Sequence, residues 1–446
     1  MTSITEGLAR YAFQCSFDDL PQEVVIQAKR CFTDTIGVML AAAESPTVKI
    51  LTALIQDLGG NQQASVVKGG GKTTVLNASL INGAMAHVLD FDDLHSGAIT
   101  HTSAVLIPAV LSGGEWKERD GKEVICSFVA GFEVMTRISM AAGMGQHQLE
   151  LGWHPTSTVG RFGAAVCFGK MLHASASQLA ASMGIAATQS SGLIRVFGTM
   201  TKHLNAGKAS HDGVFSALLA HRGFSAPADI LEGEDGFCRV LSGKFDPKPI
   251  TENLGQRFEI MNNSFKPYPS CRQTHPVVDA CSEIYKKYSF RPADIKEVIC
   301  EVNPVAPQTA GIEDPHDANE AKFSLYYCAA RALMGDVSMS SFRIQEIEDE
   351  EVRKLMKCIK IKTNPSFNIA NACVEVKTAS GQKAISKVNA SKGSPENRMT
   401  DSELESKFLN LALPVIKDNR KTEDILHILN ELEKEKNLSN LMRLLS

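Results

Sequence analysis

The sequence lacks the features that mark several broad classes of protein. Its 11 cysteines form no CxxC pair and no regular spacing, which argues against a disulfide framework and for reduced thiols. The 46 Lys and Arg are scattered among 50 Asp and Glu, with no basic patch for nucleic acid or an anionic membrane. No apolar run reaches the ~20 residues of a membrane span, and the first residues show no leader pattern. We expect a cytoplasmic globular protein, with an imported matrix protein as the alternative.

The motifs of common enzyme classes are also missing. The glycine run 68–74 is not a phosphate-binding loop, because Val66 stands where that motif needs glycine, so we expect a loop that enters a helix. No Gly-x-Ser-x-Gly elbow and no HExxH pair is present. Metal binding is the rival chemistry for the acids and histidines of residues 90–101, but their spacing does not continue as a calcium loop. We expect no metal.

The pattern of apolar residues predicts an all-α first half. A length of 446 residues exceeds one domain of ~100–200 residues, so we expect two domains or an insertion. Apolar residues recur at helical spacing and almost nothing alternates at period two before residue 250. The segments predicted to be helical are 21–43, 46–58, 75–89, 104–111, 122–142, 157–172, 176–189 and 208–221.

The pattern changes after residue 256. The second part mixes strand-like and helical segments, which predicts a smaller α+β domain. The predicted strands are 295–302, 359–363, 373–377 and 384–389, and the predicted helices are 277–288 and 320–333. Helical patterning then returns. We therefore predict a mainly α protein with a large all-helical domain (residues 1–256), an inserted smaller α+β domain (257–395) and C-terminal helices that rejoin the first domain (396–446).

Residues 86–101 are the most informative stretch. Three aspartates and three histidines follow a run of small and apolar residues that predicts a buried helix. A buried helix that ends in acids and histidines commonly ends at a pocket. We interpret Asp90 and His101 as pocket residues, because the segment that joins them is loop-like and too polar to be buried without a function. Asp92 and Asp93 are interpreted as helix-capping residues or lysine partners, and His87 as a core or surface histidine.

Four further segments combine charged or aromatic polar residues with turn-forming ones. They are residues 152–157, 199–208, 264–276 and 321–327. Each is weak alone, and His154 could be only part of a turn and helix cap. Together they supply what an anionic, carboxylate-bearing substrate needs, namely Lys and Arg to bind carboxylates, His and Asp to move protons, and Tyr to donate one.

These motifs, in this order and over nearly the whole chain, resemble the MmgE/PrpD family, which includes 2-methylcitrate dehydratase, cis-aconitate decarboxylase and iminodisuccinate epimerase. The matching segments are Asp90-Phe91-Asp92-Asp93 with His101, Gly152-Trp153-His154-Pro155-Thr156, Thr201-Lys202-His203-Leu204 with Gly207-Lys208-Ala209, and Tyr268-Pro269-Ser270-Cys271-Arg272 with His275-Pro276. The resemblance implies a helical main domain built from both chain ends, an inserted α+β lid domain, a homodimer, and a pocket at the domain junction without metal or organic cofactor.

The resemblance also implies roles for individual residues. The implied catalytic residues are Asp90, His101, His275 and Tyr327, and the implied substrate-binding residues are His154, Lys202, Lys266 and Arg272. His101 would be the general acid or base, with Asp90 hydrogen-bonded to it. The cationic side chains would bind the substrate carboxylates, while His275 and Tyr327 would deliver a proton from the lid.

The predicted function is a cofactor-independent lyase for a small di- or tricarboxylate, of the 2-methylcitrate dehydratase type. Where cis-aconitate decarboxylases carry Thr after the Asp-Phe-Asp-Asp run, this chain has Leu94, and its loop to His101 is one residue longer. A hydroxyl that could bond a substrate carboxylate is therefore missing, which disfavours the decarboxylase. The alternatives are a cis-aconitate decarboxylase-type lyase, an iminodisuccinate epimerase-type isomerase and a non-catalytic carboxylate-binding protein.

Overall fold

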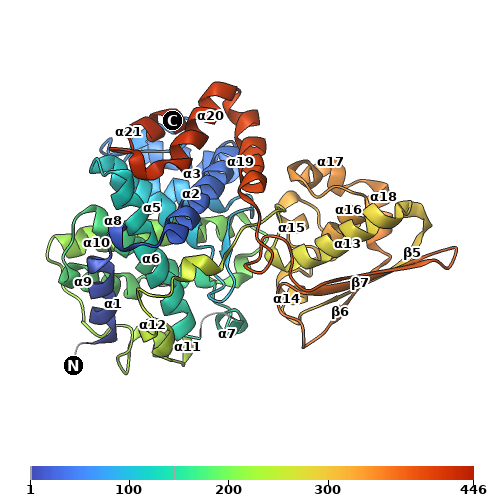
Figure 1. Ribbon diagram of the computed structural model, residues 1–446, viewed down its shortest axis with the longest axis horizontal. Helices are drawn as coiled ribbons and strands as arrows, with labels where there is room; N and C mark the ends of the chain where they lie inside the picture. The colour runs from blue at the N-terminus through green and yellow to red at the C-terminus, as the bar shows by residue number, and fades with distance from the viewer. Residues whose placement is uncertain (1–2, 144–145) are drawn as a thin grey trace.

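The computed structural model describes residues 3–143 and 146–446. Most of these residues are helical, which confirms the mainly α prediction. Figure 1 shows a larger body of helices and a smaller body that contains a sheet, and the red C-terminal helices lie on the larger body beside the blue N-terminal ones. The chain therefore leaves the larger body once and returns to it.

The larger body is helical. Its helices are α1 (Ile4–Gln14), α2 (Gln22–Ala42), α3 (Pro46–Leu58), α4 (Val75–His87), α5 (Thr102–Trp116), α6 (Gly121–Ala141), α7 (Gln146–Glu150), α8 (Pro155–Met171), α9 (Ala176–Thr188), α10 (Met200–His221), α11 (Phe237–Ser242), α12 (Lys248–Thr251), α19 (Asp401–Ile416), α20 (Asn419–Asn430) and α21 (Ser439–Leu445). Its strands are two residues long each: β1 (Ala64–Ser65) pairs with β2 (Lys72–Thr73), and β3 (Leu94–His95) with β4 (Asn263–Ser264). The glycine run thus leads into α4, as predicted, and it closes a short hairpin that was not predicted.

Small residues bring the central helices of this body into close contact. Gly83 of α4 faces Gly207 of α10, and a Cβ added to Gly83 would lie 2.8 Å from the Gly207 Cα. No residue larger than glycine fits at this crossing without moving a backbone. The crossing fixes the C-terminal end of α4, where His87 lies, against the N-terminal half of α10, where Lys202 lies.

Helix α6 is the core helix of the larger body. It is 21 residues long and, by length and composition alone, apolar enough to cross a membrane, which differs from the sequence expectation. However, 94% of its most apolar window is buried inside the structure. Its hydrophobicity is therefore explained by the neighbouring helices that cover it.

The smaller body is an α+β unit. Its strands β5 (Ile295–Val302), β6 (Ile359–Thr363), β7 (Ala372–Thr378) and β8 (Lys383–Val388) form one sheet of order β6-β5-β7-β8, in which only β5 and β6 are parallel. Burial alternates along β7 and β8, as the period-two pattern predicted. The sheet is covered by helices on its buried face. The helices are α13 (His275–Tyr288), α14 (Ala306–Ala310), α15 (Ala318–Ala321), α16 (Leu325–Leu333), α17 (Ile344–Ile347) and α18 (Glu350–Met356).

One predicted helix is interrupted. The segment 320–333 is divided into α15 and α16, because Ser324 adopts an extended backbone and its hydroxyl caps α16 by accepting from the Tyr327 N–H. The break places Phe323 in the wall of a cavity between the two bodies.

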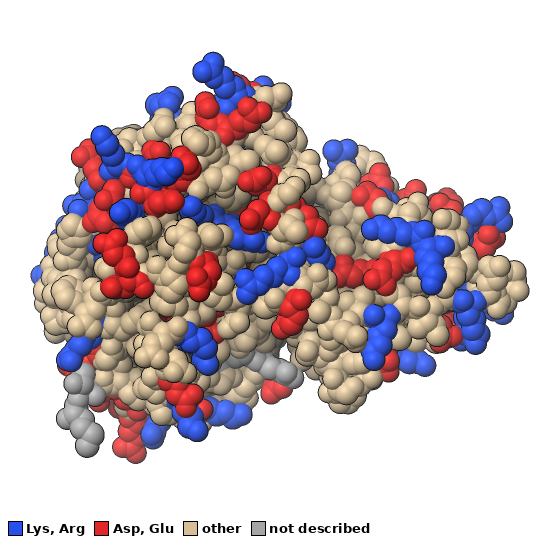
Figure 2. All heavy atoms as spheres, viewed as in Figure 1, with Lys and Arg blue, Asp and Glu red and all other residues tan. Residues whose placement is uncertain are grey.

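Each body has its own hydrophobic core. One core contains buried residues from 8 to 265 and from 399 to 445, and the other contains residues from 277 to 388. Phe258, Ile260 and Phe265 pack in the larger core. The visible face carries both signs of charge interspersed over both bodies (Figure 2).

Candidate active site

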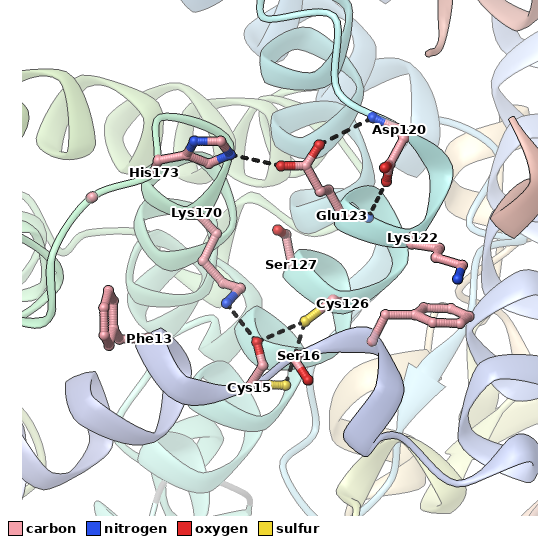
Figure 3. Close-up of a pocket in the computed structure, with 12 residues that line it drawn as sticks. Phe13, Cys15, Ser16, Asp120, Lys122, Glu123, Cys126, Ser127, Lys170 and His173 are labelled. Atoms are coloured by element: carbon pink, nitrogen blue, oxygen red, sulfur yellow. Dashed lines mark hydrogen bonds and ion pairs between the residues drawn. The ribbon is translucent and has the colours of Figure 1, made fainter. Parts of the chain in front are cut away.

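The predicted site residues do not line the roomiest of the cavities described for this structure. A cavity of about 390 Å³ is lined by residues of α1, α6 and α8, and it contains none of them (Figure 3). A second cavity of about 70 Å³ lies where the two bodies meet. Its walls are Asp90, Leu94, Ile99, His101, Leu149, His154, Pro155, Phe197, Lys202, Lys266, Cys271, Arg272, Gln273, Thr309, Phe323 and Ile369. Six of the eight predicted residues therefore share this cavity, and we assign the candidate site to it.

The ends of three long helices converge on this cavity. His101 is the N-cap residue of α5, His154 is the N-cap residue of α8, and Lys202 lies in the first turn of α10. Neither histidine side chain caps its own helix. A helix N-terminus carries about half a positive charge and unpaired N–H groups, so this arrangement favours an anion.

Asp90 is held between two lysines. Its Oδ1 pairs with Lys202, its Oδ2 lies 3.2 Å from the Lys266 Nζ, and its carbonyl accepts a hydrogen bond of 2.8 Å from the same Nζ. Burial alone would raise the pKa of Asp90, but the charges of Lys202 and Lys266 outweigh it and hold the pKa well below its usual value. Asp90 is therefore a fixed anion that orients two cations.

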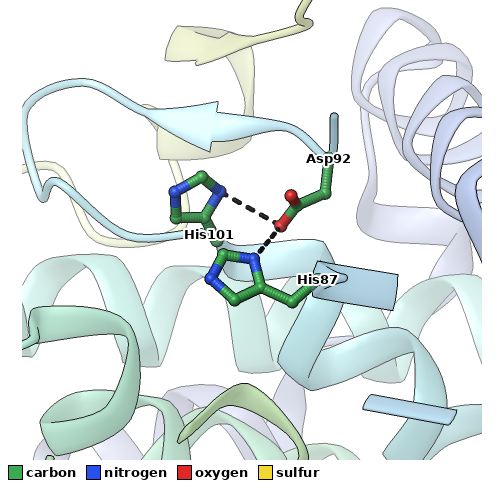
Figure 4. Close-up of side chains that lie close together, drawn as sticks. All are labelled: His87, Asp92 and His101. Carbon is green, nitrogen blue, oxygen red and sulfur yellow. Dashed lines mark hydrogen bonds and ion pairs between the residues drawn. The ribbon is translucent and has the colours of Figure 1, made fainter. Parts of the chain in front are cut away.

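His101 is oriented by Asp92 and not by Asp90. Asp92 Oδ2 lies 2.8 Å from His87 Nδ1 and 3.0 Å from His101 Nδ1, and the two rings are 4.5 Å apart between centroids. Figure 4 shows the other nitrogen of His101 on the side of the ring away from Asp92. This corrects the predicted hydrogen bond between Asp90 and His101, and it gives Asp92 the orienting role.

The imidazoles at the site are neutral bases. Burial lowers the pKa of His87 to about 4 and that of His203 to about 3, and it lowers the pKa values of His101 and His154 as well. Nearby lysine charge adds to this effect. Of these four residues, His101 and His154 line the cavity. His87 is fully buried, which agrees with its interpretation as a core histidine, and no role was predicted for His203.

Two other polar residues of the loop, Asp93 and His95, make contacts away from the cavity. Asp93 accepts from the Ser103 hydroxyl and, at 2.6 Å, from the Asn263 Nδ2. His95 Nδ1 accepts from the Ala98 N–H, and its Nε2 lies 3.5 Å from Glu259. These contacts hold the loop in its conformation, and neither Asp93 nor His95 lines the cavity.

Arg272 has spare hydrogen-bonding capacity at the cavity. Its Nη1 contacts His275 Nδ1 at 3.1 Å and the Lys392 carbonyl at 2.9 Å, while Nε and Nη2 are buried without a hydrogen-bond partner among the described residues. Burial lowers the pKa of Arg272 to about 10, so it stays charged at neutral pH. A buried guanidinium with unpaired N–H groups is costly, and a carboxylate would satisfy them.

Two predicted catalytic residues lie outside the cavity wall. His275 is fully buried, donates from Nε2 to the Ser270 carbonyl at 3.1 Å and accepts from Arg272 at Nδ1, so both ring nitrogens are used. Tyr327 lies in the smaller core, and its hydroxyl donates to the Ser341 carbonyl. Neither is placed to transfer a proton in this conformation, which corrects both roles; His275 instead orients Arg272.

A further buried cation, Lys322, comes from the predicted segment 321–327 but was given no individual role. Lys322 is 5% exposed, and burial lowers its pKa to about 8, with Asp90 opposing this and Lys202 and Lys266 adding to it. Lys202, Lys266 and Arg272 line the cavity, and Asp90 is the one carboxylate among its described lining residues. Lys322 is not a lining residue, but its charge interacts with Asp90 and with both lysines. The cationic side chains outnumber the carboxylate, so the net charge around the cavity is positive. This charge makes the cavity complementary to an anion with more than one charge.

Among the residues that the structure describes, His87, Asp92 and His101 form a group that could hold a metal ion. Their ligand atoms lie within 4.8 Å of one another, and imidazole nitrogens suit zinc. However, the positive charges of Lys202 and Lys266 lower the pKa of His101, so their field acts at this group. A positive field of this kind opposes the binding of a further cation, and it favours the acid–base interpretation of the group.

The loop that carries the site contains two residues in the left-handed region. Asp90 has φ 52° and Ile99 has φ 50°. This conformation is costly for a β-branched residue such as Ile99, which lines the cavity. Strain of about 1–3 kcal/mol per residue is typically kept where it positions functional groups.

Fold and site together define a mainly helical protein with an acid–base pair in an electropositive cavity between two bodies. The chain belongs to the MmgE/PrpD family: residues 6–250 match the MmgE/PrpD N-terminal domain and residues 268–431 match the MmgE/PrpD C-terminal domain. The family named from the sequence is thereby confirmed.

The chain is similar to two curated relatives over its full length and to a third over part of it. It is 25% identical to the cis-aconitate decarboxylase of Homo sapiens, over 100% of this chain and 95% of that protein. It is 24% identical to a cis-aconitate decarboxylase-like protein of Aspergillus oryzae, over 100% of this chain and 97% of that protein. It is 27% identical to the cis-aconitate decarboxylase of Aspergillus terreus, over 64% of this chain and 61% of that protein.

Proposed function

We propose that the protein is a cofactor-independent lyase that acts on a small di- or tricarboxylate. The observation that carries the proposal is a neutral, oriented imidazole, His101, in a cavity with surplus buried positive charge. Cations bind the substrate carboxylates and stabilise charge that develops at the adjacent carbon. A neutral imidazole beside them removes the proton from that carbon.

The reaction we favour is dehydration of a 2-methylcitrate-type substrate. His101 Nε2 takes a proton from the carbon next to a carboxylate, Asp92 stabilises the imidazolium, and the hydroxyl on the neighbouring carbon leaves as water. Lys202 and Lys266 are the ammonium donors at the cavity wall that can protonate the leaving hydroxyl. Leu94 and Ile99 give the wall an apolar patch suited to a substrate methyl group.

Decarboxylation of cis-aconitate is the second candidate. It is favoured by the three relatives described above, all of which are named cis-aconitate decarboxylase or a protein like it. The same cations would hold the two retained carboxylates, and His101 would return a proton to the carbon that loses CO₂.

We also propose that the smaller body acts as a lid. The cavity of about 70 Å³ is small beside the ~300–1,000 Å³ of ordinary ligand sites. Arg272 and Phe323 line it from the smaller body, and Asp90, His101 and Lys202 from the larger one. Movement between the bodies would admit the substrate, and closure would exclude water. A homodimer, expected from the resemblance, and a cytoplasmic location, expected from the cysteines and the N-terminal sequence, are part of the same proposal; light scattering measures the dimer.

The test is a panel of 2-methylcitrate, citrate, cis-aconitate and iminodisuccinate in D₂O, followed by NMR and by CO₂ release. Loss of water identifies the dehydratase, CO₂ the decarboxylase, and deuterium uptake with neither the epimerase. His101→Asn should abolish turnover, while His427→Gln, 73% exposed at the side chain, should not change it. No turnover of any substrate refutes the lyase proposal; thermal stabilisation without turnover would indicate a carboxylate-binding protein.

A further inference from the structure

Two cysteines lie in contact at the cavity of about 390 Å³, which has no role in the proposed reaction. Cys15, at the C-terminal end of α1, lies with its Sγ 3.6 Å from the Sγ of Cys126 in α6. Figure 3 shows the two sulfur atoms facing each other at the base of the cavity. Residues 15 and 126 are 111 positions apart, so only the fold brings them together.

The surroundings make this pair accessible and hold it in place. Both cysteines line a cavity of about 390 Å³, Cys15 is partly exposed, and Phe13 beside it is 51% exposed. Lys170 of α8 donates to the carbonyls of Ala12 at 2.7 Å and Cys15 at 3.0 Å, which fixes the end of α1. Cys126 is 4% exposed, so an oxidant can reach Cys15, whose thiol already contacts that of Cys126.

The electrostatic setting favours a reactive sulfur. The hydrogen bond between the thiols lowers the pKa of Cys126 and raises that of Cys15; burial raises both values and the charge of Lys170 opposes it, so Cys126 is the sulfur with the lowered pKa. The thiolate is the nucleophile in thiol oxidation, and a neighbouring ammonium stabilises it.

We propose that Cys15 and Cys126 form a peroxide-sensitive dithiol, which closes to a disulfide and fastens α1 to α6. One sulfur, as its thiolate, attacks a peroxide oxygen and becomes a sulfenic acid while the O–O bond breaks and hydroxide leaves. The second thiol then attacks that sulfur, the S–O bond breaks, water leaves and the S–S bond forms. The peroxide is reduced by two electrons and the two thiols are oxidised. The sulfurs need to approach from 3.6 Å to about 2.05 Å, by side-chain rotation.

The chain offers a matched control. Cys281 and Cys300 also hydrogen-bond to each other, but they lie in the smaller core and are both 0% exposed. Contact between thiols is therefore common to the two pairs, and solvent access distinguishes them. Peroxide should oxidise the first pair and spare the second in the folded protein.

The experiment treats the full-length protein with hydrogen peroxide, blocks free thiols with iodoacetamide and maps peptides by mass spectrometry. We expect one cross-linked peptide pair joining residues 15 and 126, reversal by dithiothreitol, and a rise in melting temperature of about 2–4 °C for a protein of this size. Cys15→Ser should lose both the cross-link and the temperature shift, while Cys281→Ser should keep both.

Three results would overturn the proposal. One is the absence of the 15–126 cross-link when other thiols are oxidised. Another is equal oxidation of Cys281 and Cys300, which would mean that the protein unfolds during treatment. The third is an unchanged temperature shift in Cys15→Ser, since the shift would then come from another site.

Discussion

At the scale of single residues, the two aspartates of the loop after α4 have different partners. Asp92 contacts His87 and His101, while Asp90 binds Lys202 and Lys266. We expect Asp92→Asn to lower kcat by about 10²–10⁴-fold with a small change in KM, because the base loses its orientation and its stabilising charge. Asp90→Asn should raise KM as well, because two carboxylate-binding lysines lose their anchor. Steady-state kinetics of both variants measures the difference; the reverse pattern would contradict the assignment.

The pH dependence of kcat/KM tests the state of His101. Burial lowers its pKa below 6.5, Asp92 raises it, and the charges of Lys266 and Lys202 lower it further. A base acts only when unprotonated, so we expect activity to stay constant as pH falls from 7.5 to 6.5 and to drop below that. Lys266→Met removes one lowering charge and should move the acid limb to higher pH. An acid limb that stays in place in this variant would mean that another group titrates.

Leu94 tests which lyase reaction the cavity performs. Its side chain is 5% exposed and lines the cavity, with no hydroxyl to offer a carboxylate. Leu94→Thr should shift the ratio of CO₂ release to dehydration upward by about tenfold, the value of one hydrogen bond of about 1.4 kcal/mol. The ratio is measured on cis-aconitate and 2-methylcitrate, with Leu94→Val as the size control. An equal ratio in both variants would show that the hydroxyl is not the determinant.

At the scale of helices and strands, α19 connects the C-terminal segment to the site. Lys407 donates to Asp34 at 2.6 Å and to the carbonyls of Phe91 at 2.7 Å and Lys266 at 2.9 Å. Those carbonyls belong to the two chain segments that carry Asp90 and Lys266. Lys407 therefore positions the site without touching the cavity.

Lys407→Met should lower stability and activity through different contacts. Leaving Asp34 buried without its partner costs about 3–5 kcal/mol of unfolding free energy, measured by urea denaturation. Displaced carbonyls should lower kcat by about 10–100-fold. Adding Asp34→Asn should recover most of the stability and none of the kcat. If kcat recovers together with stability, Lys407 has a purely structural role.

Sequence periodicity predicted individual elements better than the contacts between them. Strands 295–302 and 359–363 and helix 46–58 have the predicted bounds. The break at Ser324 was missed because no Gly or Pro marks it, and the cap depends on an extended backbone that the fold imposes. Spacing shows that a segment is helical, but it does not show which neighbour each face meets.

The location of the candidate site was predictable from the sequence, but the contacts between its side chains were only partly predictable. The loop from Asp90 to His101 and the cations Lys202, Lys266 and Arg272 meet as expected. The pairing of Asp92 with His101 was not visible, because the left-handed backbone at Asp90 redirects the chain between Asp90 and Asp92, which are two positions apart. Tyr327 was misplaced because its helix turns it into the smaller core.

At the scale of the whole molecule, the site joins two bodies with separate hydrophobic cores. Asp90, His101 and Lys202 come from the larger body and Arg272 from the smaller one. A polyanion that contacts all of them would couple the stability of the two bodies, because it binds only when both are folded and in contact.

Calorimetry tests this coupling. Without ligand we expect two unfolding transitions, with the smaller body, which has the smaller core, melting first. A tricarboxylate at about 1,000 times its Kd should add about 4 kcal/mol to the unfolding free energy and merge the transitions, since opening the smaller body then releases the ligand. Arg272→Met should keep the transitions separate in the same ligand concentration, because the smaller body no longer holds a carboxylate. A ligand that raises only the upper transition, in the unsubstituted protein, would place the binding groups in the larger body alone and exclude the smaller body from the site.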